Sequence, residues 1–541
     1  MSAGDFSLAS EPWIAARLLD GTSAEVSLRE AFAGAREIRE IDGESPTQVF
    51  ALIRLMLAIL YRTRAGDPLT WEHWVRWYRD GLPLKSIDAY FDEFGDRFDL
   101  FGARPFMQVA DLATASGDMK DVGAIILDLP SNNRLFTNRA GAGAVDLSFA
   151  EAARWLVNAQ AFDPSGIKSG ALGDPRVKGG KGYPLGVAWS GLLGGLYATG
   201  ASLHETLLLN LVPTSVDVIT ANTDADIPPW EEDVPDDATE RAGLIPQGPV
   251  RLYTWQSRRI RLFRSDDRVV GCLVANGDKL TPQNGFSHEP MSAWRYSDPQ
   301  TKKAKQTTYM PREHQPGRAL WRGIAALLPG LAGTVPKSDI PISRPPGVVE
   351  WLAQLEEAGV LGAGSFRLRA VGVVYGSNNS VVDEMISDEV SVPLTLLRQA
   401  DRALAAQADE AVRLADEGVR HLRNLADNLM RAAGGEGEGL RTRATDLAYA
   451  TLDLPYRQWL ASLQAGRDPL EAIAEWKHIA AQTLRRLGAQ LVADAGPAAW
   501  AGREVTRLGR GELITTPRAE GWFLRALTRT FGAPDRKGQV A

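Results

Sequence analysis

The C-terminal part of this 541-residue chain carries one long amphipathic stripe, which restricts its fold more than any other feature. The apolar positions of the stripe are Leu397, Leu404, Ala408, Val412, Ala415, Val419, Leu422, Ala426 and Leu429. Their spacing of three, four or seven residues is the period of an α-helix with one buried face. The stripe therefore predicts a helix of many turns that packs against other helices.

Three further helical segments follow the stripe, at about residues 440–464, 468–493 and 519–530. A glycine-rich stretch at 434–439 provides the first turn between them. Long helices joined by short Gly or Pro turns pack as an antiparallel bundle. The sequence thus predicts a C-terminal four-helix bundle over residues 387–541.

Residues 1–386 mix the signals of strands and helices, so the fold class is predicted to be α+β, with a large mixed α/β N-terminal domain. Asp20-Gly21 separates two short strand-like runs, which predicts a hairpin. Ser45-Pro46-Thr47 opens an apolar helix at 50–61, and the aromatic stripe at 71–78 is interpreted as core. The uncharged run 186–203 is predicted to be buried, and 366–375 to be a strand.

Charge is unevenly distributed along the chain, although the formal net charge is only −7. Residues 251–322 hold fourteen Lys or Arg against six Asp or Glu, and residues 131–190 hold seven against four. The segment RLYTWQSRRIRLFR at 251–264 predicts a strand with one cationic face. Residues 222–240 hold eight acidic side chains and no basic one, which predicts a solvated surface loop. Weak DNA binding by the free chain is expected.

Most enzyme motifs are absent from the sequence: there is no phosphate-binding GxxxxGK[ST] loop, no zincin motif and no GxSxG elbow. One cysteine, Cys272, excludes an intramolecular disulfide. The N-terminus has no signal-peptide pattern, so we expect a cytoplasmic protein without a membrane segment. Asp383, Glu384 and Asp388 are the only candidates for a metal cluster, and they are more simply interpreted as charges that precede a helix.

Five segments together resemble one family. They are the block FSLASEPWIAARLLDGTSAEVSLREAFAGAREIREIDGESPTQVFALIRLMLAIL at 6–60, LFTNRAG at 135–141, GIKSG at 166–170, RALWRGIAALL at 318–328 and VVYGSNNSVVDE at 373–384. Their content and order resemble the CasA family, the large subunit of the type I-E CRISPR surveillance complex Cascade. The resemblance extends over nearly the whole chain.

This resemblance implies a non-catalytic subunit that needs no cofactor. Its implied partners are the other Cascade subunits, the 5′ handle of the guide crRNA, double-stranded target DNA and a recruited helicase-nuclease. The subunit is expected to recognise the short protospacer-adjacent motif from the minor groove and to begin strand separation. Minor-groove recognition mainly distinguishes A·T from G·C pairs, so several motif sequences should be tolerated.

Two loops are assigned by matching the family's motifs. Phe136 and Asn138 match a loop that holds the guide-RNA handle, where a Phe can stack on an unpaired base; the alternative is a small core anchor. A loop that lies against the minor groove matches Ser165, Gly166, Lys168 and Ser169, and Lys168 in this loop could meet a phosphate. This glycine loop departs from the family pattern at Pro164 and Ser165, so the resemblance leaves the preferred motif undefined.

The resemblance also implies a wedge formed by Asn378, Asn379 and Ser380. An amide inserted at the first base pair offers donors and acceptors to bases that have lost their partners. The alternative is an ordinary hairpin turn, because Asn tolerates the left-handed conformation. A minor-groove lysine of the family aligns loosely with Lys302, Lys303 and Lys305.

Two other functions stay open at this point. The chain is alternatively a stand-alone metal-dependent hydrolase that uses Asp383, Glu384 and Asp388. It is otherwise a helical adaptor that binds only protein. Metal-dependent nuclease activity of the isolated chain would favour the first, and loss of all guide-RNA crosslinking from the Phe136 loop would favour the second.

Overall fold

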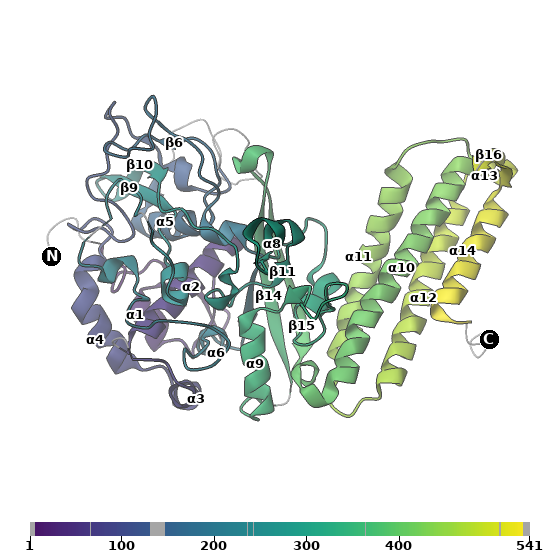
Figure 1. Ribbon diagram of the computed structural model, residues 1–541, viewed down its shortest axis with the longest axis horizontal. Coiled ribbons are helices and arrows are strands. Elements are labelled where there is room, and N and C mark those ends of the chain that lie inside the picture. Colours follow the sequence, from purple (N-terminus) through teal and green to yellow (C-terminus); the bar gives the residue numbers. More distant parts are fainter. Residues whose placement is uncertain are drawn as a thin grey trace. The chain divides into compact units, whose positions relative to one another are not determined.

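The computed structural model describes residues 6–64, 67–129, 146–234, 236–241, 243–362, 364–507 and 510–533. The chain divides into two compact units. The first comprises Met1–Leu320, Ala332–Val360 and Phe366–Glu389, and the second comprises Trp321–Leu331, Leu361–Ser365 and Val390–Ala541. Both helices and sheets are present, as the predicted α+β class requires (Figure 1). The domain boundary predicted at 386/387 stays a prediction, because compact units do not test which part folds alone.

The first unit begins with a small antiparallel sheet of order β2-β1-β3. Its strands are β1 (Ile14–Leu18), β2 (Ser23–Val26) and β3 (Ile38–Ile41). The predicted hairpin is confirmed, because β1 and β2 pair on either side of Asp20-Gly21. Gly21 has a φ of +89°, a conformation that a turn requires and that glycine adopts without steric cost.

A buried helix, α2 (Pro46–Arg62), forms the centre of this unit. Ser45 caps it by accepting a hydrogen bond from the Gln48 amide, and Pro46 occupies the first turn, so the predicted start is confirmed. Helices α5 (Phe149–Phe162) and α7 (Pro249–Tyr253) pack against α2. The aromatic stripe lies on α3 (Trp71–Asp80), where Trp74 and Trp77 are buried, which confirms its interpretation as core.

Two short sheets and several helices also belong to the first unit. Strands β11 (Trp294–Tyr296), β12 (Tyr309–Pro311) and β13 (Ser343–Arg344) form one sheet, and β6 (Lys168–Ser169) pairs with β7 (Lys181–Gly182). The remaining helices are α1 (Leu28–Ala33), α4 (Leu84–Phe94), α6 (Leu203–Asn210), α8 (Asp298–Ala304) and α9 (Gly347–Glu357). The uncharged run contains β8 (Gly195–Thr199), which is buried throughout, as predicted.

The basic strand differs from its prediction. The segment 251–264 is part helix, because α7 ends at Tyr253, and β9 spans only Arg258–Ser265. β9 pairs with β10 (Arg268–Asn276), which also pairs with β4 (Lys120–Asp121) and β5 (Leu147–Ser148). Arg258 and Arg259 are buried and paired with Asp163 and Asp278. The prediction of one cationic face is therefore wrong, because internal carboxylates bind these arginines.

The acidic stretch 222–240 also differs from its prediction. Glu231 is nearly buried and forms an ion pair with Arg62, with 2.6 Å between Oε2 and Nη2. Asp226 is buried and accepts hydrogen bonds from the amides of Val250 and Arg251. The prediction of a solvated surface loop is thus wrong for Glu231 and Asp226. Their binding partners lie outside residues 222–240, so a charge count over that stretch does not include them.

Another three-stranded sheet, of order β15-β14-β8, carries the loop that was predicted to be the wedge. Its long strands are β14 (Ser365–Tyr375) and β15 (Val382–Pro393), and a single 3₁₀ turn, η7 (Ser377–Asn379), joins them. The predicted strand at 366–375 is confirmed. The expectation of helix beyond residue 387 is wrong, because β15 continues to Pro393 and the long helix begins only at Arg402.

Four long helices dominate the second unit: α10 (Arg402–Ala432), α11 (Gly439–Ala461), α12 (Pro469–Ala493) and α14 (Thr516–Phe531). Helix α10 packs against the other three, and α12 also packs against α11 and α14. Helices α11, α12 and α14 confirm the helical segments predicted at about 440–464, 468–493 and 519–530. Leu397, the first position of the stripe, lies instead in a 3₁₀ turn before α10.

Helix α13 (Pro497–Ala501) and the hairpin of β16 (Arg503–Arg507) and β17 (Arg510–Ile514) precede α14. No helix in the described ranges is long and apolar enough to cross a membrane.

Candidate nucleic-acid interface

The glycine loop and the wedge loop, which lie far apart in the sequence, meet in the structure. The glycine loop follows α5, and the wedge loop joins β14 to β15. The backbone amide of Ser165 donates a hydrogen bond of 2.7 Å to the carbonyl oxygen of Asn379. A Cβ added to Gly166 would lie 3.5 Å from the Cβ of Ser380. Two of the sequence-predicted sites therefore form one surface of the first unit.

The glycine loop is shaped by the backbone conformation of Gly166, whose φ of +124° is one that L residues rarely adopt. Ser165 and Ser169 are buried, so their side chains contribute little to the exposed surface of the loop. At the end of the loop, Gly170 lies directly against Gly180, where a Cβ would overlap the Gly180 carbonyl. The pairing of β6 with β7 thus depends on the absence of a side chain at residue 170.

Lys168 does not project freely into solvent, although the sequence suggested that it could meet a phosphate. Its side chain is 11% exposed, and its ammonium group is paired with the Asp163 carboxylate. The same carboxylate oxygen accepts a hydrogen bond from Nε of Arg258. Burial, reinforced by the positive charge of Arg258, lowers the pKa of Lys168 to about 8 against the attraction of Asp163. Contact of Lys168 with a phosphate stays a prediction.

The wedge loop places two consecutive asparagines in the left-handed region. The φ angles of Asn378 and Asn379 are 55° and 54°, and both residues are exposed. Asn is among the few residues that accept this conformation readily. Ser380 closes the turn, because its hydroxyl donates to the Ser377 carbonyl at 2.8 Å. This geometry fits both the wedge and the ordinary hairpin turn, so the amides need an experiment that separates the two.

Tyr375 anchors the base of the wedge loop and was not singled out from the sequence. Its hydroxyl donates a hydrogen bond of 2.7 Å to the carbonyl of Phe162, the last residue of α5. Burial raises the pKa of Tyr375 well above its ordinary value, so the hydroxyl remains a donor. Asp163 and Arg258 were also missed as members of this site. No local pattern in the sequence connects the three residues.

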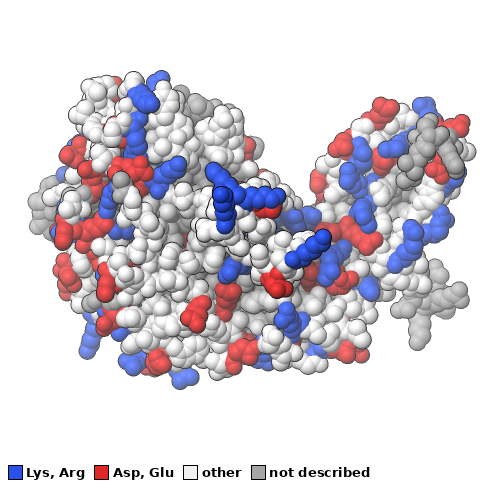
Figure 2. All heavy atoms as spheres, viewed as in Figure 1, with Lys and Arg blue, Asp and Glu red and all other residues white. Residues whose placement is uncertain are grey.

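The candidate lysines lie on or next to the short helix α8. Lys302 is paired with Asp298 one turn earlier, at 2.6 Å between Nζ and Oδ2. Lys303 and Lys305 are exposed, and in the described part of the chain neither has a carboxylate partner. Figure 2 shows Lys and Arg side chains gathered over α8. No hydrogen bond or ion pair among the described residues joins these lysines to the glycine or wedge loop.

The remaining predicted residues have two different outcomes. Phe136 and Asn138 lie outside the described residues.

Asp383, Glu384 and Asp388 lie on β15, so they do not precede a helix as interpreted, and Asp383 and Asp388 point to opposite faces of the strand. Asp388 instead accepts a hydrogen bond from the Leu320 amide at 2.6 Å. Over the described ranges no three His, Cys, Asp or Glu side chains lie together as a group that could hold a metal ion.

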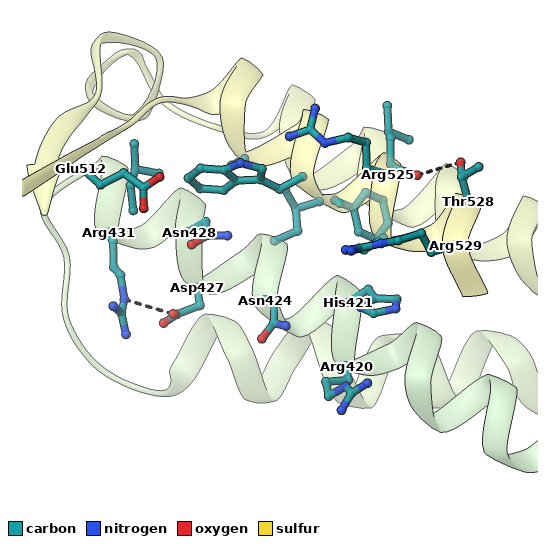
Figure 3. A pocket seen from close by; sticks show the side chains of 17 residues that line it. Arg420, His421, Asn424, Asp427, Asn428, Arg431, Glu512, Arg525, Thr528 and Arg529 are labelled. Carbon is teal, nitrogen blue, oxygen red and sulfur yellow. Dashed lines mark hydrogen bonds and ion pairs between the residues drawn. The ribbon is translucent and has the colours of Figure 1, made fainter. Parts of the chain in front are cut away.

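A polar groove of about 1130 Å³ lies in the second unit, between α10 and α14 (Figure 3). Its charged and aromatic lining includes Arg420, His421, Asp427, Arg431, Glu512, Trp522, Arg525 and Arg529. Arg431 is paired with Asp427 at 3.0 Å, and the Thr530 hydroxyl lies 2.9 Å from Nε2 of His421. The groove contains none of the residues that the sequence singled out.

Comparison with known proteins gives one consistent result. The profile of the CRISPR-associated protein Cse1 family matches residues 7–487. A curated relative, the CRISPR-associated protein CasA/Cse1 of Thermus thermophilus, is 30% identical over 465 residues, which are 83% of each chain.

Solved structures agree with this match over almost the whole chain. The crystal structure of Thermobifida fusca Cse1 is 43% identical, with a TM-score of 0.90 and 98% of both chains covered. Cse1 from Acidimicrobium ferrooxidans is 31% identical, with a TM-score of 0.81, and the comparison covers 98% of this chain and 99% of that one. A chain of a CRISPR RNA-guided surveillance complex shares the fold at 17% identity, with a TM-score of 0.67 over 98% of this chain and all of that one.

Proposed function

Because the chain belongs to the CRISPR-associated protein Cse1 family, whose profile matches residues 7–487, we propose that it is the large subunit of a type I-E CRISPR RNA-guided surveillance complex. In this role it is non-catalytic and works in the cytoplasm with the other Cascade subunits. Helices α10, α11, α12 and α14 would form the four-helix bundle of the family. The likeness to Cse1 structures along nearly the full chain supports the proposal.

The proposed subunit recognises the protospacer-adjacent motif of double-stranded DNA from the minor groove and opens the duplex to start R-loop formation. The observation that carries this proposal is the hydrogen bond between the Ser165 amide and the Asn379 carbonyl. It joins a loop whose Gly166 carries no side chain, and so allows close approach to a narrow groove, to a turn that exposes two amides. Reading a motif and separating the next base pair require such a pair of elements side by side.

Further contacts complete the proposed role. The loop with Phe136 and Asn138 would hold the 5′ handle of the guide crRNA, with the Phe ring stacked on a base. The exposed Lys303 and Lys305 are the best candidates for the lysine that reaches into the minor groove of the target duplex, since Lys302 is already paired with Asp298. The open duplex would then be cut by a separate helicase-nuclease that this subunit helps to recruit.

The wedge is tested by separating the amide of Asn379 from its backbone conformation. Glycine accepts a φ of 54° more easily than Asn, so Asn379→Gly keeps the turn and removes only the amide. We expect Asn379→Gly to reduce motif-dependent duplex binding by the assembled complex about fivefold, the effect of roughly one net hydrogen bond. Electrophoretic mobility shift with matched and scrambled motifs measures the change.

The neighbouring turn residue supplies a control for this experiment. Ser377→Ala changes an exposed residue of the same turn whose hydrogen bonds to Ser380 use only its backbone carbonyl, and it should leave binding unchanged. If Asn379→Gly and the double variant Asn378→Gly/Asn379→Gly bind as the wild type does, the loop is an ordinary hairpin turn. The wedge role would then be wrong.

The α8 lysines are predicted to differ in their effect on DNA binding. Lys303→Ala and Lys305→Gly should each weaken binding about threefold at low salt and should reduce the salt slope, because each removes an unpaired cation. Lys302→Ala should have a smaller effect, because Lys302 shares its charge with Asp298. Glycine at residue 305 preserves the left-handed conformation, with a φ of 55°. Equal salt slopes for all three variants would contradict the assignment.

A further inference from the structure

We propose that Asp163, Arg258 and Lys168 form a buried positioning cluster that holds the glycine loop and the wedge loop as one rigid element. Motif recognition and strand separation would then be mechanically coupled, instead of being performed by two independent loops. This inference rests on the function proposed for the two loops. It adds three positioning residues, none of which is required to touch DNA.

Arg258 is the centre of the cluster. Its guanidinium donates to the Asp163 carboxylate and also to four backbone carbonyls: those of Ser257 at 2.9 Å, Asp163 at 3.2 Å, Pro164 at 3.0 Å and Gly186 at 2.9 Å. Two of these carbonyls belong to the first residues of the glycine loop. A planar fork with five donors can hold several carbonyls at once, whereas a lysine presents a single flexible point charge. Arg258 therefore fixes the path of the backbone as the chain leaves α5.

Asp163 connects this support to the far side of the loop. It is buried, and its carboxylate is shared between Arg258 and the ammonium of Lys168. Lys168 belongs to β6, at the other end of the glycine loop. One carboxylate thus binds both ends of a loop whose central Gly166 has great conformational freedom. Removing a partner from such a buried ionic group leaves an uncompensated charge, so separating the three side chains is energetically costly.

The wedge loop is attached to the same short stretch of chain at two points. The Tyr375 hydroxyl binds the carbonyl of Phe162, and the Asn379 carbonyl accepts from the amide of Ser165. These two attachment points lie on either side of Asp163. A shift of the backbone at Asp163 must therefore displace the wedge together with the glycine loop.

Hydrogen exchange of the free full-length protein tests the coupling without DNA. In Arg258→Met we expect amide exchange to accelerate about tenfold or more both in 163–169 and in 376–380, since both loops lose a shared support. The matched control is Arg259→Met. Arg259 is the adjacent buried residue of β9, is ion-paired with Asp278 and also donates to carbonyls, but it contacts residues 237–239 instead of the glycine loop. Its variant should leave both loops unchanged.

Two further variants distinguish geometry from charge and from loss of folding. Arg258→Lys keeps the positive charge but cannot hold the four carbonyls that the guanidinium binds, so its exchange should resemble that of Arg258→Met. Tyr375→Phe removes one attachment and leaves the cluster intact, so exchange should accelerate at 376–380 and stay unchanged at 163–169. Normal exchange at both loops in folded Arg258→Met, acceleration at 163–169 alone, or full rescue by Arg258→Lys would each overturn the proposal.

The functional consequence is measured on the assembled complex with 2-aminopurine at the first base pair beside the motif. Arg258→Met should lower motif discrimination and base-pair opening in parallel, each by about tenfold, while Arg259→Met changes neither. If the wild-type complex shows no motif discrimination, the proposed function fails, although the exchange results can still establish the cluster. If discrimination falls while opening is preserved, the coupling is wrong.

Discussion

Arg54→Met is expected to lower the free energy of unfolding of the first unit by about 3–5 kcal/mol, the cost of breaking a buried ion pair by removing one partner. Arg54 forms two hydrogen bonds with Glu289, at 2.8 and 2.7 Å, and the exposed fractions of the two side chains are 1% and 0%. Its guanidinium also lies over the Tyr253 ring, 4.2 Å from the centroid. Methionine fills much of the space of the arginine side chain, so the loss of stability comes chiefly from removing the positive charge.

In Arg54→Met the Glu289 carboxylate stays buried without its cationic partner. It keeps only two hydrogen-bond donors, the indole of Trp189 and the amide of Met291. Guanidinium chloride titration, followed by hydrogen exchange of α2, measures the change in unfolding free energy. The matched control is Arg29→Met: Arg29 has two ion pairs of similar length, with Asp88 and Asp92, but these lie at the surface. We expect that control to cost about 0–1 kcal/mol. Equal costs for the two variants would contradict the central role of the buried pair.

Local patterns in the sequence predicted much of the secondary structure. The start of α2 followed from Ser45 and Pro46, because capping depends on neighbouring residues alone. The late helices followed from an apolar period that one helix face determines by itself. The long stripe failed only at its beginning. Leu397 keeps the spacing, but β15 continues to Pro393 and a 3₁₀ turn follows before α10.

Charge counted along the sequence was a poor guide to the surface. The arginines of β9 and the carboxylates of 222–240 were predicted to face water, yet several are buried because they find partners elsewhere. Arg258 pairs with Asp163, and Arg62 pairs with Glu231, across separations of 95 and 169 residues. Such pairing depends on tertiary structure, which no short window of sequence contains.

The candidate site shows the same division between local and distant information. The family resemblance selected the glycine loop and the wedge loop separately, and each contains the Gly or Asn that its backbone conformation requires. The contact between these two loops and the support from Arg258 and Tyr375 could not be predicted, because they join segments that are far apart in the chain. Tyr375 and Phe162, for example, are separated by 213 residues. Phe136 and Asn138 stay predictions from the resemblance alone.

Gly170→Ala is expected to reduce motif-dependent duplex binding by the assembled complex about hundredfold, the scale of loss when a site is displaced by roughly 1 Å. A Cβ at residue 170 would overlap the Gly180 carbonyl and lie 3.0 Å from the Lys181 amide nitrogen. Both neighbours are backbone atoms, so neither can rotate away as a side chain would. The chain must instead open the pairing of Lys168 with Gly182 and of Ser169 with Lys181.

This opening affects the glycine loop because β6 holds Lys168, which is paired with Asp163. The overall stability should change little, since β6 and β7 are two-residue strands that form a separate two-stranded sheet. A binding titration with matched and scrambled motifs, together with the thermal unfolding midpoint, separates the two effects. Gly95→Ala is the control, because Gly95 has a helical φ of −58° and a Cβ there meets no atom within 4 Å. If Gly170→Ala retains wild-type motif discrimination, the backbone path of the glycine loop does not determine motif recognition, and the minor-groove role of this loop would have to be abandoned.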